Sequence, residues 1–274
     1  MSQETEKYID FIRSLSGLDI SVYDNTFLEK TINSRKVDTS SKTDQEYLSY
    51  LTNVPEEPAE LLRQLSNSYS EFFRNPLTFS YLEQIILPQL IEKKKIRNEN
   101  EIRIWSAACA SGQEAYSLAI VCDELIGNNN TKINCRIFAT DNNPNELMDA
   151  QKGVYYSTAL GKVTLKRIQT YFTLKGETYT INPQLRDKID FSVFDLLSDQ
   201  ASCPPASVYG NFDLVFCSNL LFYYKPEYRD SILGKIGNSL AKGAYIITGE
   251  TEREILMGKN YREVFVHSAI FQKR

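Results

Sequence analysis

The sequence predicts an α/β protein with a doubly wound, mostly parallel sheet and a small helical domain in front of it. From Ile102 onward, short apolar runs typical of strands alternate with helical patterns, which favours parallel strands with helices on both faces. Residues 1–75 show only short amphipathic helical stripes. We therefore expect a helical domain over 1–75 and an α/β domain over 76–274, with an inserted β-subdomain at about 168–185.

The N-terminal region has the pattern of several short helices. Tyr8, Ile12 and Leu15 fall on one helical face, and Gly17 is a suitable end for that helix. Thr43 followed by Glu46 matches a capping box at the start of a further helix. Short amphipathic helices are unstable alone, so we expect these to bury their apolar stripes against one another.

The segment Ser70–Pro76 joins the two parts and contains Phe72, Phe73 and Arg74. It fits either an aromatic plug with a surface arginine or a ligand contact at a domain junction. A helix is expected from about Leu77, with Pro88 bending or ending its first part.

A strand at Ile102–Ser106 is followed by small residues from Ala107 to Gly112 and by a helix that opens at Gln113. Small side chains let a ligand approach the backbone, and the free amide groups of the next helix would point toward that ligand. This pattern favours a nucleotide-binding turn. An ordinary strand-to-helix crossover is the alternative, since it also needs a tight turn.

The second strand, Cys135–Thr140, ends at Asp141, which lies 29 positions after Gly112. An acidic residue at this place in a parallel sheet can accept hydrogen bonds from both hydroxyls of a ribose. Alternatively, Asp141 caps a helix that begins at Pro144.

The remaining pattern predicts a β-hairpin over Tyr171–Ile181 around Lys175-Gly176 and further strands. These are expected at Ile189–Phe194, Phe212–Cys217, Tyr245–Thr248 and the alternating run Val264–Gln272.

The composition limits the classes of protein to which the chain can belong. The chain is 42% hydrophobic and 24% charged, and no apolar run approaches the roughly 18 residues that cross a bilayer. Its first residues lack the pattern of a signal peptide, so we expect a cytoplasmic protein with no membrane insertion. The five cysteines form no Cys-x-x-Cys pair and there is a single histidine, His267, so no metal site is expected.

The same residues restrict the chemistry. We expect the cysteines to be reduced, half-buried thiols and His267 to be a strand residue, which argues against a histidine-based triad.

Residues 1–75 carry 8 Lys or Arg against 13 Asp or Glu, and the rest of the chain carries 23 against 22. Neither part has the basic excess that a nucleic-acid partner requires.

These stretches together resemble the CheR-type chemotaxis-receptor protein-glutamate O-methyltransferases, which use S-adenosyl-L-methionine and release S-adenosyl-L-homocysteine. The resemblance covers most of the chain. Its motifs are Phe72-Phe73-Arg74, Trp105–Cys109 with Ser111-Gly112, Ala139–Asp141, Gly153–Tyr155, Tyr171-Phe172, and Phe212–Cys217 leading to Asn219 and Tyr223. The resemblance implies a seven-stranded methyltransferase sheet.

It also implies roles for individual residues. Arg74 and Tyr223 would lie at the transferring methyl group as the catalytic residues, and Arg74 would also contact the cofactor. The other cofactor-binding positions implied are Ser68, Ser70, Ala107, Gly112, Glu114, Asp141, Asp195, Leu196, Ser218 and Asn219. Asp141 would hold the ribose, and Asp195 with Leu196 would lie near the adenine.

Several positions depart from the family pattern. Ser218 replaces an arginine, Gln113 replaces a glutamate and Ser68 replaces an asparagine. The family presents a basic helix to acidic receptors, and here Arg35, Lys36 and Lys42 are what remains of that face.

The implied reaction is methyl esterification of a protein substrate, namely glutamate side chains on the cytoplasmic helices of a chemotaxis receptor. A second hypothesis, motivated by Ser218 and Gln113, is a cofactor-binding module that holds a protein partner without methyl transfer. A nicotinamide-dependent dehydrogenase is the third, but its Gly-x-Gly-x-x-Gly turn is missing, because Ala107–Gly112 contains one glycine.

Overall fold

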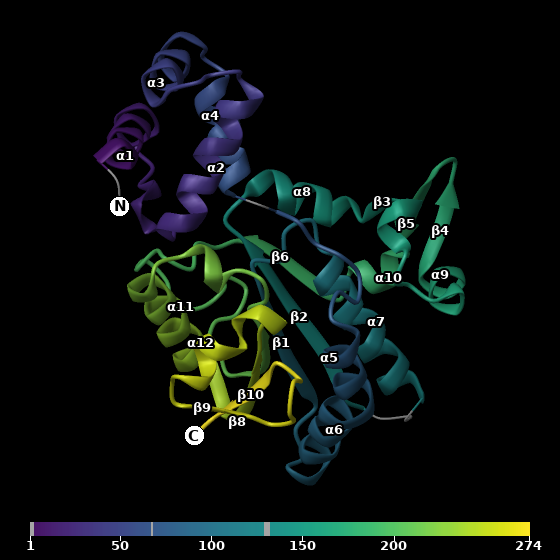
Figure 1. Ribbon diagram of the computed structural model, residues 1–274. Coiled ribbons are helices and arrows are strands. Elements are labelled where there is room, and N and C mark those ends of the chain that lie inside the picture. The colour runs from purple at the N-terminus through teal and green to yellow at the C-terminus, as the bar shows by residue number, and fades with distance from the viewer. Residues whose placement is uncertain (1–2, 67, 129–131) are drawn as a thin grey trace. The chain divides into compact units, whose positions relative to one another are not determined.

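The computed structural model describes residues 3–66, 68–128 and 132–274 (Figure 1). They form two compact units. One comprises Met1–Asn67 and Phe222–Asp230, and the other comprises Ser68–Leu221 and Ser231–Arg274. The sequence places a boundary at residue 75, whereas the units divide after residue 67 and the distant segment 222–230 joins the first unit.

The first unit is helical. Its elements are α1 Gln3–Ser16, the 3-10 turn η1 Ile20–Val22, α2 Asn25–Asp38, α3 Asp44–Asn53 and α4 Glu57–Leu65. Thr43 Oγ1 accepts the Glu46 N–H at 3.2 Å and so caps α3, while the Glu46 carboxylate accepts the N–H of Lys42 at 2.6 Å. The amphipathic stripes face one another, because Tyr8, Leu28 and Leu61 are all at most 1% exposed.

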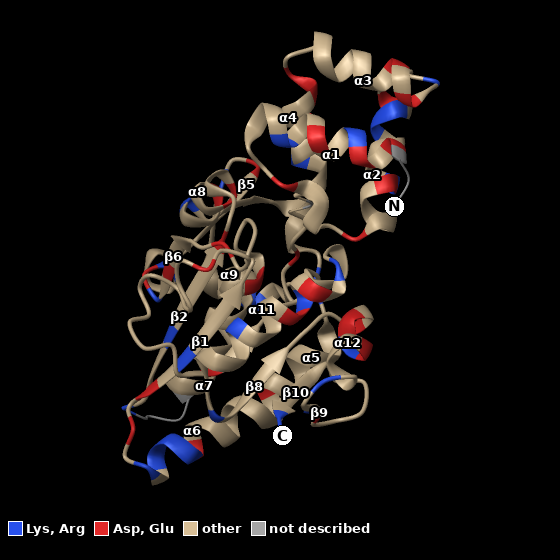
Figure 2. Cartoon of the chain, turned by 90° about the vertical axis from the view of Figure 1, so that its left-hand side faces the viewer, with Lys and Arg blue, Asp and Glu red and all other residues tan. Residues whose placement is uncertain are grey.

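A buried ion pair lies inside this unit. Arg35 of α2 donates two hydrogen bonds to Glu57 of α4, from Nε at 2.8 Å and from Nη2 at 2.6 Å, and Tyr47 donates to the same carboxylate at 2.7 Å. Lys36 pairs with Asp44 at 3.0 Å. Acidic and basic residues are interspersed along these helices (Figure 2). The expectation that Arg35 and Lys36 belong to an open basic face is therefore wrong, since both are engaged within the unit.

The second unit contains the main sheet. Its strands are β1 Glu101–Ala107, β2 Asn134–Asp141, β6 Ile189–Val193, β7 Phe212–Phe216, β8 Leu240–Ile247, β9 Tyr261–Glu263 and β10 Ile270–Lys273. The described residues form seven strands in the order β6-β2-β1-β7-β8-β10-β9. Neighbours from β6 to β8 pair in parallel, and β10 pairs antiparallel with both β8 and β9. The predicted doubly wound, mostly parallel sheet is confirmed.

Both faces of the sheet centre are buried. Ile102 and Ile104 of β1 belong to the same apolar cluster as Leu118 of α7 Gln113–Asn128. Trp105 lies against Phe212 on the neighbouring strand, with ring centroids 5.3 Å apart, and against Phe194 after β6. Every residue of β1 from Ile104 to Ala107 is buried, as expected for a parallel strand that is covered on both faces.

The helical stretch before β1 changes its hydrogen-bonding pattern in the middle. It runs through α5 Pro76–Tyr81, the π-helical turn η2 Leu82–Ile86 and α6 Leu87–Ile96. Pro88 lies in the first turn of α6, where its missing N–H is tolerated. The sequence predicts that Pro88 bends or ends the first part of the helix, whereas the stretch stays helical to Ile96 and its irregular turn lies just before the proline.

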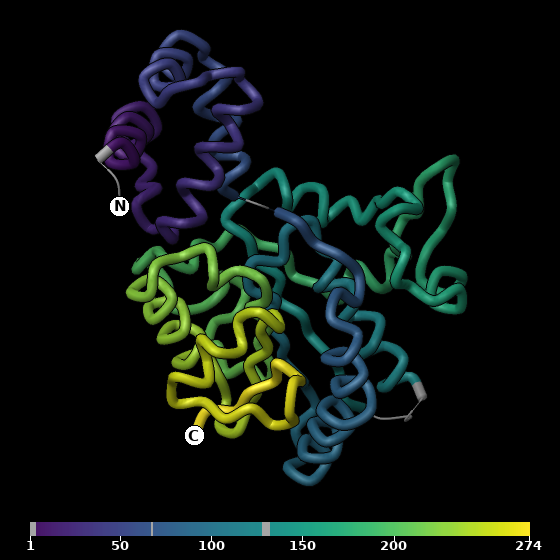
Figure 3. Tube along the Cα trace, viewed as in Figure 1, coloured from purple at the N-terminus to yellow at the C-terminus, as the bar shows by residue number. Residues whose placement is uncertain are grey.

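A second, three-stranded sheet forms between α8 Pro144–Lys152 and β6, where the chain leaves the main sheet and returns to it (Figure 3). The predicted hairpin is present as β4 Phe172–Lys175 and β5 Thr178–Ile181. The sequence analysis missed β3 Val154–Tyr156, which pairs with β5 on its other side. The helical segments η3 Ser157–Leu160, α9 Leu165–Tyr171 and α10 Pro183–Arg186 accompany these strands.

The end of the chain differs from its prediction. The run Val264–Gln272 is not one strand, because the chain turns between β9 and β10. His267 lies in that turn, exposed and with φ +61°, so its assignment to a strand is wrong. An alternating apolar pattern does not by itself distinguish one strand from a strand that follows a turn. The other segments here are η4 Leu221–Tyr223, α11 Pro226–Ser239, η5 Glu250–Glu252 and α12 Arg253–Met257.

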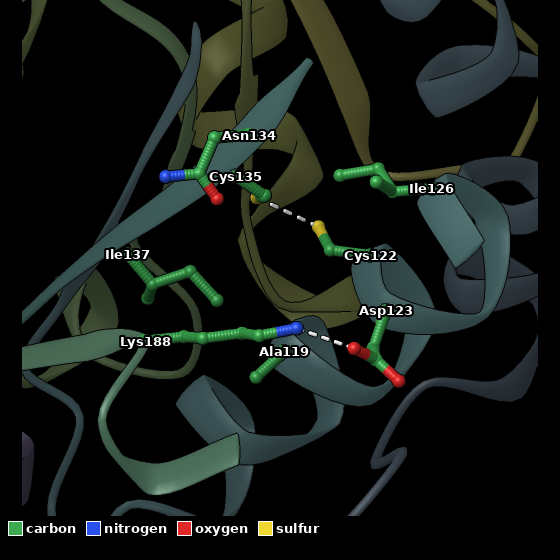
Figure 4. A pocket seen from close by; sticks show the side chains of 8 residues that line it. All are labelled: Ala119, Cys122, Asp123, Ile126, Asn134, Cys135, Ile137 and Lys188. Atoms are coloured by element: carbon green, nitrogen blue, oxygen red, sulfur yellow. Dashed lines mark hydrogen bonds and ion pairs between the residues drawn. The ribbon is translucent and has the colours of Figure 1, made fainter. Parts of the chain in front are cut away.

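All five cysteines are free thiols. Cys109, Cys122, Cys135 and Cys217 are buried, deeper than the half-buried state expected, and Cys203 is intermediate. Figure 4 shows Cys122 of α7 beside Cys135 of β2, with their Sγ atoms 2.9 Å apart, at a cavity of about 30 Å³. This cavity lies toward the amino end of β2 and is about the size of one water molecule.

Within the described ranges, no helix is both long enough and apolar enough to cross a bilayer. The same residues contain no group of three or more His, Cys, Asp or Glu side chains placed to hold a metal ion.

The buried pair in the first unit gives a stability prediction. Removing one partner of a buried ion pair leaves the other charge without compensation, so Arg35→Met should lower the free energy of unfolding by about 3 kcal/mol. Arg13→Met is the matched control, because Arg13 pairs with Asp10 and Asp19 at the surface and should cost less than about 1 kcal/mol. Urea unfolding followed by circular dichroism measures both, and equal losses in the two variants would contradict the prediction.

Candidate functional site

The candidate site is at the carboxyl edge of the main sheet. The strand order reverses at β1, since β2 and β6 lie on one side of it and β7 and β8 on the other. In open α/β sheets the crevice for a ligand forms at such a reversal, outside the carboxyl ends of the strands. The residues that follow β1, β2, β6 and β7 are therefore the ones placed to contact a ligand.

The turn after β1 has an unusual backbone. Ala108, Ala110 and Gly112 have φ values of +62°, +46° and +90°, in the left-handed region that alanine seldom adopts. A Cβ at Gly112 would lie 2.9 Å from Ala150 Cβ, so only glycine fits there. Gly112 is thus required by the turn itself, and α7 begins at Gln113 as predicted.

Asp141 connects the ends of β1 and β2. Its Oδ2 accepts the N–H of Ala110 at 2.9 Å and its Oδ1 accepts the N–H of Asn143 at 2.9 Å. Burial raises the pKa of this carboxyl, against the opposing effect of these backbone bonds. A carboxylate has about four acceptor positions, so the backbone bonds do not exhaust it. The alternative that Asp141 caps α8 is wrong, because Asn143 accepts the capping bond from the Asn145 N–H at 3.0 Å.

Glu114 lies in the first turn of α7, over the carboxyl end of β1. Ser106 Oγ donates to its Oε1 at 2.7 Å. Burial raises the pKa of Glu114 to about 7, although the Ser106 bond and the nearby Arg74 guanidinium both lower it. The charge of Glu252 raises this pKa further.

The segment 68–74 enters the second unit beside these residues. Phe72 and Phe73 are buried, and the Phe73 N–H donates to Ser117 Oγ of α7 at 3.0 Å. Arg74 is half-buried, with Nη1 donating to the Tyr69 carbonyl at 3.2 Å and its guanidinium 5.1 Å from the centre of the Tyr69 ring. The two phenylalanines thus form an aromatic plug, and the positive charge of Arg74 lowers the pKa of Glu114.

Ser68 and Ser70 are half-buried in the same segment. The Ser68 side chain hydrogen bonds to Glu146 of α8, and this bond lowers a pKa that burial of the carboxyl raises.

Asp195 and Leu196 follow β6. The Phe194 N–H donates to the Asp141 carbonyl at 3.0 Å, which fixes the chain next to the end of β2. Asp195 is exposed and its Oδ1 accepts the Leu197 N–H at 2.8 Å, whereas Leu196 is buried.

Ser218 and Asn219 follow β7. Asn219 has φ +59°, and its N–H donates to Glu252 Oε2 at 2.7 Å. Ser218 Oγ lies 3.4 Å from Asn219 Oδ1.

Tyr223 belongs to the first unit. Its ring lies 4.6 Å from the ring of Phe27, and its carbonyl accepts the Asp24 N–H at 2.7 Å. Of the residues singled out in the sequence, Ala107, Gly112, Glu114, Asp141 and Asn219 are held at one edge of the second unit, and Tyr223 is not part of that unit.

Sequence reasoning missed three residues that hold this edge. Ser106 donates to Glu114, Tyr155 of β3 donates to the Ser111 carbonyl at 2.7 Å, and Glu252 accepts from the loop after β7. The only signal for Glu252 was its place just after the strand Tyr245–Thr248, since carboxyl ends of parallel strands meet at one edge.

Comparison with known proteins identifies the family. Residues 68–269 match the family described as "CheR methyltransferase, SAM binding domain". The chain belongs to the CheR methyltransferase family. The "Chemotaxis protein methyltransferase" of Listeria monocytogenes is 32% identical over 257 residues, which cover 92% of this chain and 92% of that protein.

The chain is also similar to another relative and to one solved structure. "Chemotaxis protein methyltransferase 1" of Pseudomonas aeruginosa is 37% identical over 185 residues, covering 66% of this chain and 64% of that protein. The N-methyltransferase NodS of Bradyrhizobium japonicum, solved with S-adenosyl-l-homocysteine, aligns with TM-score 0.39 at 14% identity, covering 78% of this chain and 97% of that one.

The chain is thus a protein methyltransferase of the CheR family, and S-adenosylmethionine is its cofactor. The carboxyl edge fits that molecule. The left-handed turn lets a ligand approach the backbone, Asp141 retains acceptor capacity, and the buried carboxyls of Asp141 and Glu114 favour a cationic ligand.

The buried Glu114 gives a pH prediction. Its carboxyl keeps a proton up to about pH 7 when folded but loses it near pH 4.5 when unfolded, so the unfolded state binds fewer protons in between. The free energy of unfolding therefore falls as pH rises through this window, by roughly 3 kcal/mol relative to Glu114→Gln.

Urea unfolding of both proteins between pH 4 and pH 8 measures this difference. Titrating groups present in both proteins contribute equally to the two free energies of unfolding, so their contributions cancel in the difference. Curves that stay parallel across the range would show that Glu114 is not held in its neutral form.

Proposed function

We propose that the protein methylates glutamate side chains on the cytoplasmic helices of a chemotaxis receptor, in the cytoplasm. The names of its relatives support this substrate, since those from Listeria monocytogenes and Pseudomonas aeruginosa are chemotaxis protein methyltransferases. The observation that supports the proposal is that the Arg74 charge acts on the buried Glu114 carboxyl at the carboxyl edge of the sheet, the edge at which Asp141 also lies.

When bound, the cofactor would supply an electrophilic methyl group on its sulfonium. The substrate carboxylate would form a C–O bond to that methyl carbon as the C–S bond breaks, leaving S-adenosyl-L-homocysteine. A glutamate is already ionised at neutral pH, so no general base is needed. This agrees with a chain whose one histidine lies in an exposed turn.

The protein's own task is to orient two reactants and to exclude water. Well-oriented intramolecular reactions suggest that such positioning lowers a barrier by up to about 7 to 11 kcal/mol. Arg74 is proposed to orient the incoming carboxylate by a charge-assisted hydrogen bond, and Tyr223 to hold it by another.

The remaining positions are proposed to hold the cofactor. Asp141 accepts from the ribose, and Ala107 with Gly112 forms the surface under it. The amino-acid part of the cofactor is contacted by Ser68, Ser70 and Glu114. Its adenine is contacted by Asp195 and Leu196. The part that lies beside β7 is contacted by Ser218 and Asn219.

A binding module without methyl transfer is the second candidate. Gln113 is buried and its Oε1 accepts from Ser111 Oγ at 3.0 Å, and Ser218 offers one hydroxyl where the family has a guanidinium. Such a protein would bind S-adenosyl-L-homocysteine and label nothing.

Transfer of tritiated methyl groups to receptor cytoplasmic fragments tests the proposal. The wild type should label them, and mild alkali should release the label as methanol, because a glutamyl methyl ester is base-labile. Label that survives alkali, or no label at all with every receptor fragment tried, would contradict the proposed substrate.

Arg74→Ala should lower turnover by at least about 100-fold, because the oriented cation beside the carboxylate is lost. Arg97→Ala is the matched control, since Arg97 is an exposed arginine of the same unit. Turnover of Arg74→Ala equal to that of the control would remove Arg74 from the mechanism.

A further inference from the structure

Glu252 is a fully buried carboxylate that binds four backbone N–H groups. Its Oε2 accepts from Asn219 at 2.7 Å and from Gly249 at 2.7 Å, and its Oε1 accepts from Leu220 at 2.7 Å and from Leu221 at 2.6 Å. Its exposed fraction is 0%. One side chain after β8 therefore holds three consecutive residues of the loop after β7.

That loop requires external support. Asn219 has φ +59°, a left-handed conformation that asparagine adopts more readily than other side-chain-bearing residues but less readily than a right-handed one, so the bonds to Glu252 stabilise it. Successive N–H groups that point to one side form a concave site for an anion. Here the anion is the Glu252 carboxylate, so its charge and the loop conformation depend on each other.

The loop also lies very close to the segment that carries Glu252. A Cβ at Gly249 would be 2.6 Å from Asn219 Nδ2 and 2.9 Å from Glu252 Oε2. Gly249 itself has φ −69°, which any residue adopts, so its absent side chain is explained by the approach of the asparagine. Glu252 thus binds the backbone N–H of Asn219, and the Asn219 side-chain amide occupies the space that a side chain at position 249 would need.

We propose that Glu252 is a positioning residue that holds Asn219 in its cofactor-binding conformation, without touching the cofactor itself. This inference rests on the proposed role of Asn219. It extends the site to a residue 33 positions away in the sequence.

The hydrogen-bonding chemistry supports the choice of a carboxylate. An ionised carboxylate only accepts, with both oxygens, and so satisfies donors on each side. A glutamine has one accepting oxygen and an NH₂ group that donates, so two of the four backbone donors would face another donor. Burial raises the pKa of Glu252, and the bonds from Gly249, Asn219, Leu221 and Leu220 oppose that shift.

The test compares Glu252→Gln with wild type in two measurements. Calorimetric titration with S-adenosyl-L-homocysteine should show an affinity at least 10-fold weaker, and the KM for the cofactor should rise by a similar factor while kcat at saturation stays within about threefold. A purely structural role would instead lower the active fraction, which reduces kcat and leaves the affinity of the folded protein unchanged. That second pattern overturns the proposal.

Asp213→Asn is the matched control. Asp213 is another buried carboxylate, near the amino end of β7, where it accepts the Arg103 N–H at 2.9 Å and pairs with Lys94 at 3.0 Å. It should lose stability but keep the wild-type affinity for S-adenosyl-L-homocysteine. Equal weakening in both variants would mean that any loss of a buried carboxylate has this effect, and it would overturn the proposal.

Gly249→Ala covers the case in which Glu252→Gln does not fold. Its methyl group crowds both the Asn219 side-chain amide and Glu252 Oε2 while the carboxylate charge is retained, so affinity should again fall by at least 10-fold. Unchanged affinity in this variant overturns the proposal as well.

Asn219→Ala separates this inference from the proposed site. If Asn219→Ala binds the nucleoside weakly and Glu252→Gln binds it normally, the positioning role fails while the site stands. If Asn219→Ala itself binds normally, the assignment of Asn219 to the cofactor fails and the positioning role fails with it.

Discussion

The hydrogen bonds of the Asp141 carboxylate are the constraint on which the rest of the site depends. They join the turn after β1 to the loop after β2, through Ala110 on one oxygen and Asn143 on the other. The left-handed residues Ala108 and Ala110 need that external support, because alanine does not favour this conformation. The main-chain bond from Phe194 to Asp141 then brings the end of β6 to the same place. Asp141 thus joins three strand ends at one edge, with its carboxylate holding the turn after β1 and the loop after β2 and its main-chain carbonyl holding the end of β6.

The charges at this edge are arranged for a cationic ligand. Burial raises the pKa of Glu114 and Asp141, so the ionised form of each is costly until positive charge arrives, whereas four backbone N–H groups already surround the Glu252 carboxylate. Arg74 supplies one such charge beside Glu114. S-adenosylmethionine carries a sulfonium that S-adenosylhomocysteine lacks, so under the proposed site assignment these carboxyls favour the cofactor over its product. In the first unit the charges are already paired, because Arg35 is neutralised by Glu57 and Lys36 by Asp44. Recognition of an acidic receptor must therefore use groups other than Arg35 and Lys36.

The sequence was sufficient where one short stretch determines the structure. The strand, turn and helix from Ile102 to Tyr116, and the carboxylate at the end of β2, follow from local periodicity and from small residues that the turn needs. It was insufficient where distant segments decide. Nothing near Val154 reveals that β3 pairs with β5, nothing near Phe222 reveals that 222–230 joins the first unit, and Arg35 was taken for a surface residue because its partner Glu57 lies on another helix. Glu252 was missed for the same reason, since three of its four donors, Asn219, Leu220 and Leu221, lie more than 30 residues before it in the sequence.

The central proposal is that the Asp141 carboxylate accepts hydrogen bonds from the ribose of the adenosyl cofactor. Calorimetric titration of S-adenosyl-L-homocysteine into the wild type and into Asp141→Ala tests it most directly. The account predicts saturable binding of one molecule per chain by the wild type, and an affinity at least about 10-fold weaker in the variant, equivalent to 1.4 kcal/mol or more. Binding of equal strength in the two proteins, with the variant folded, would contradict it.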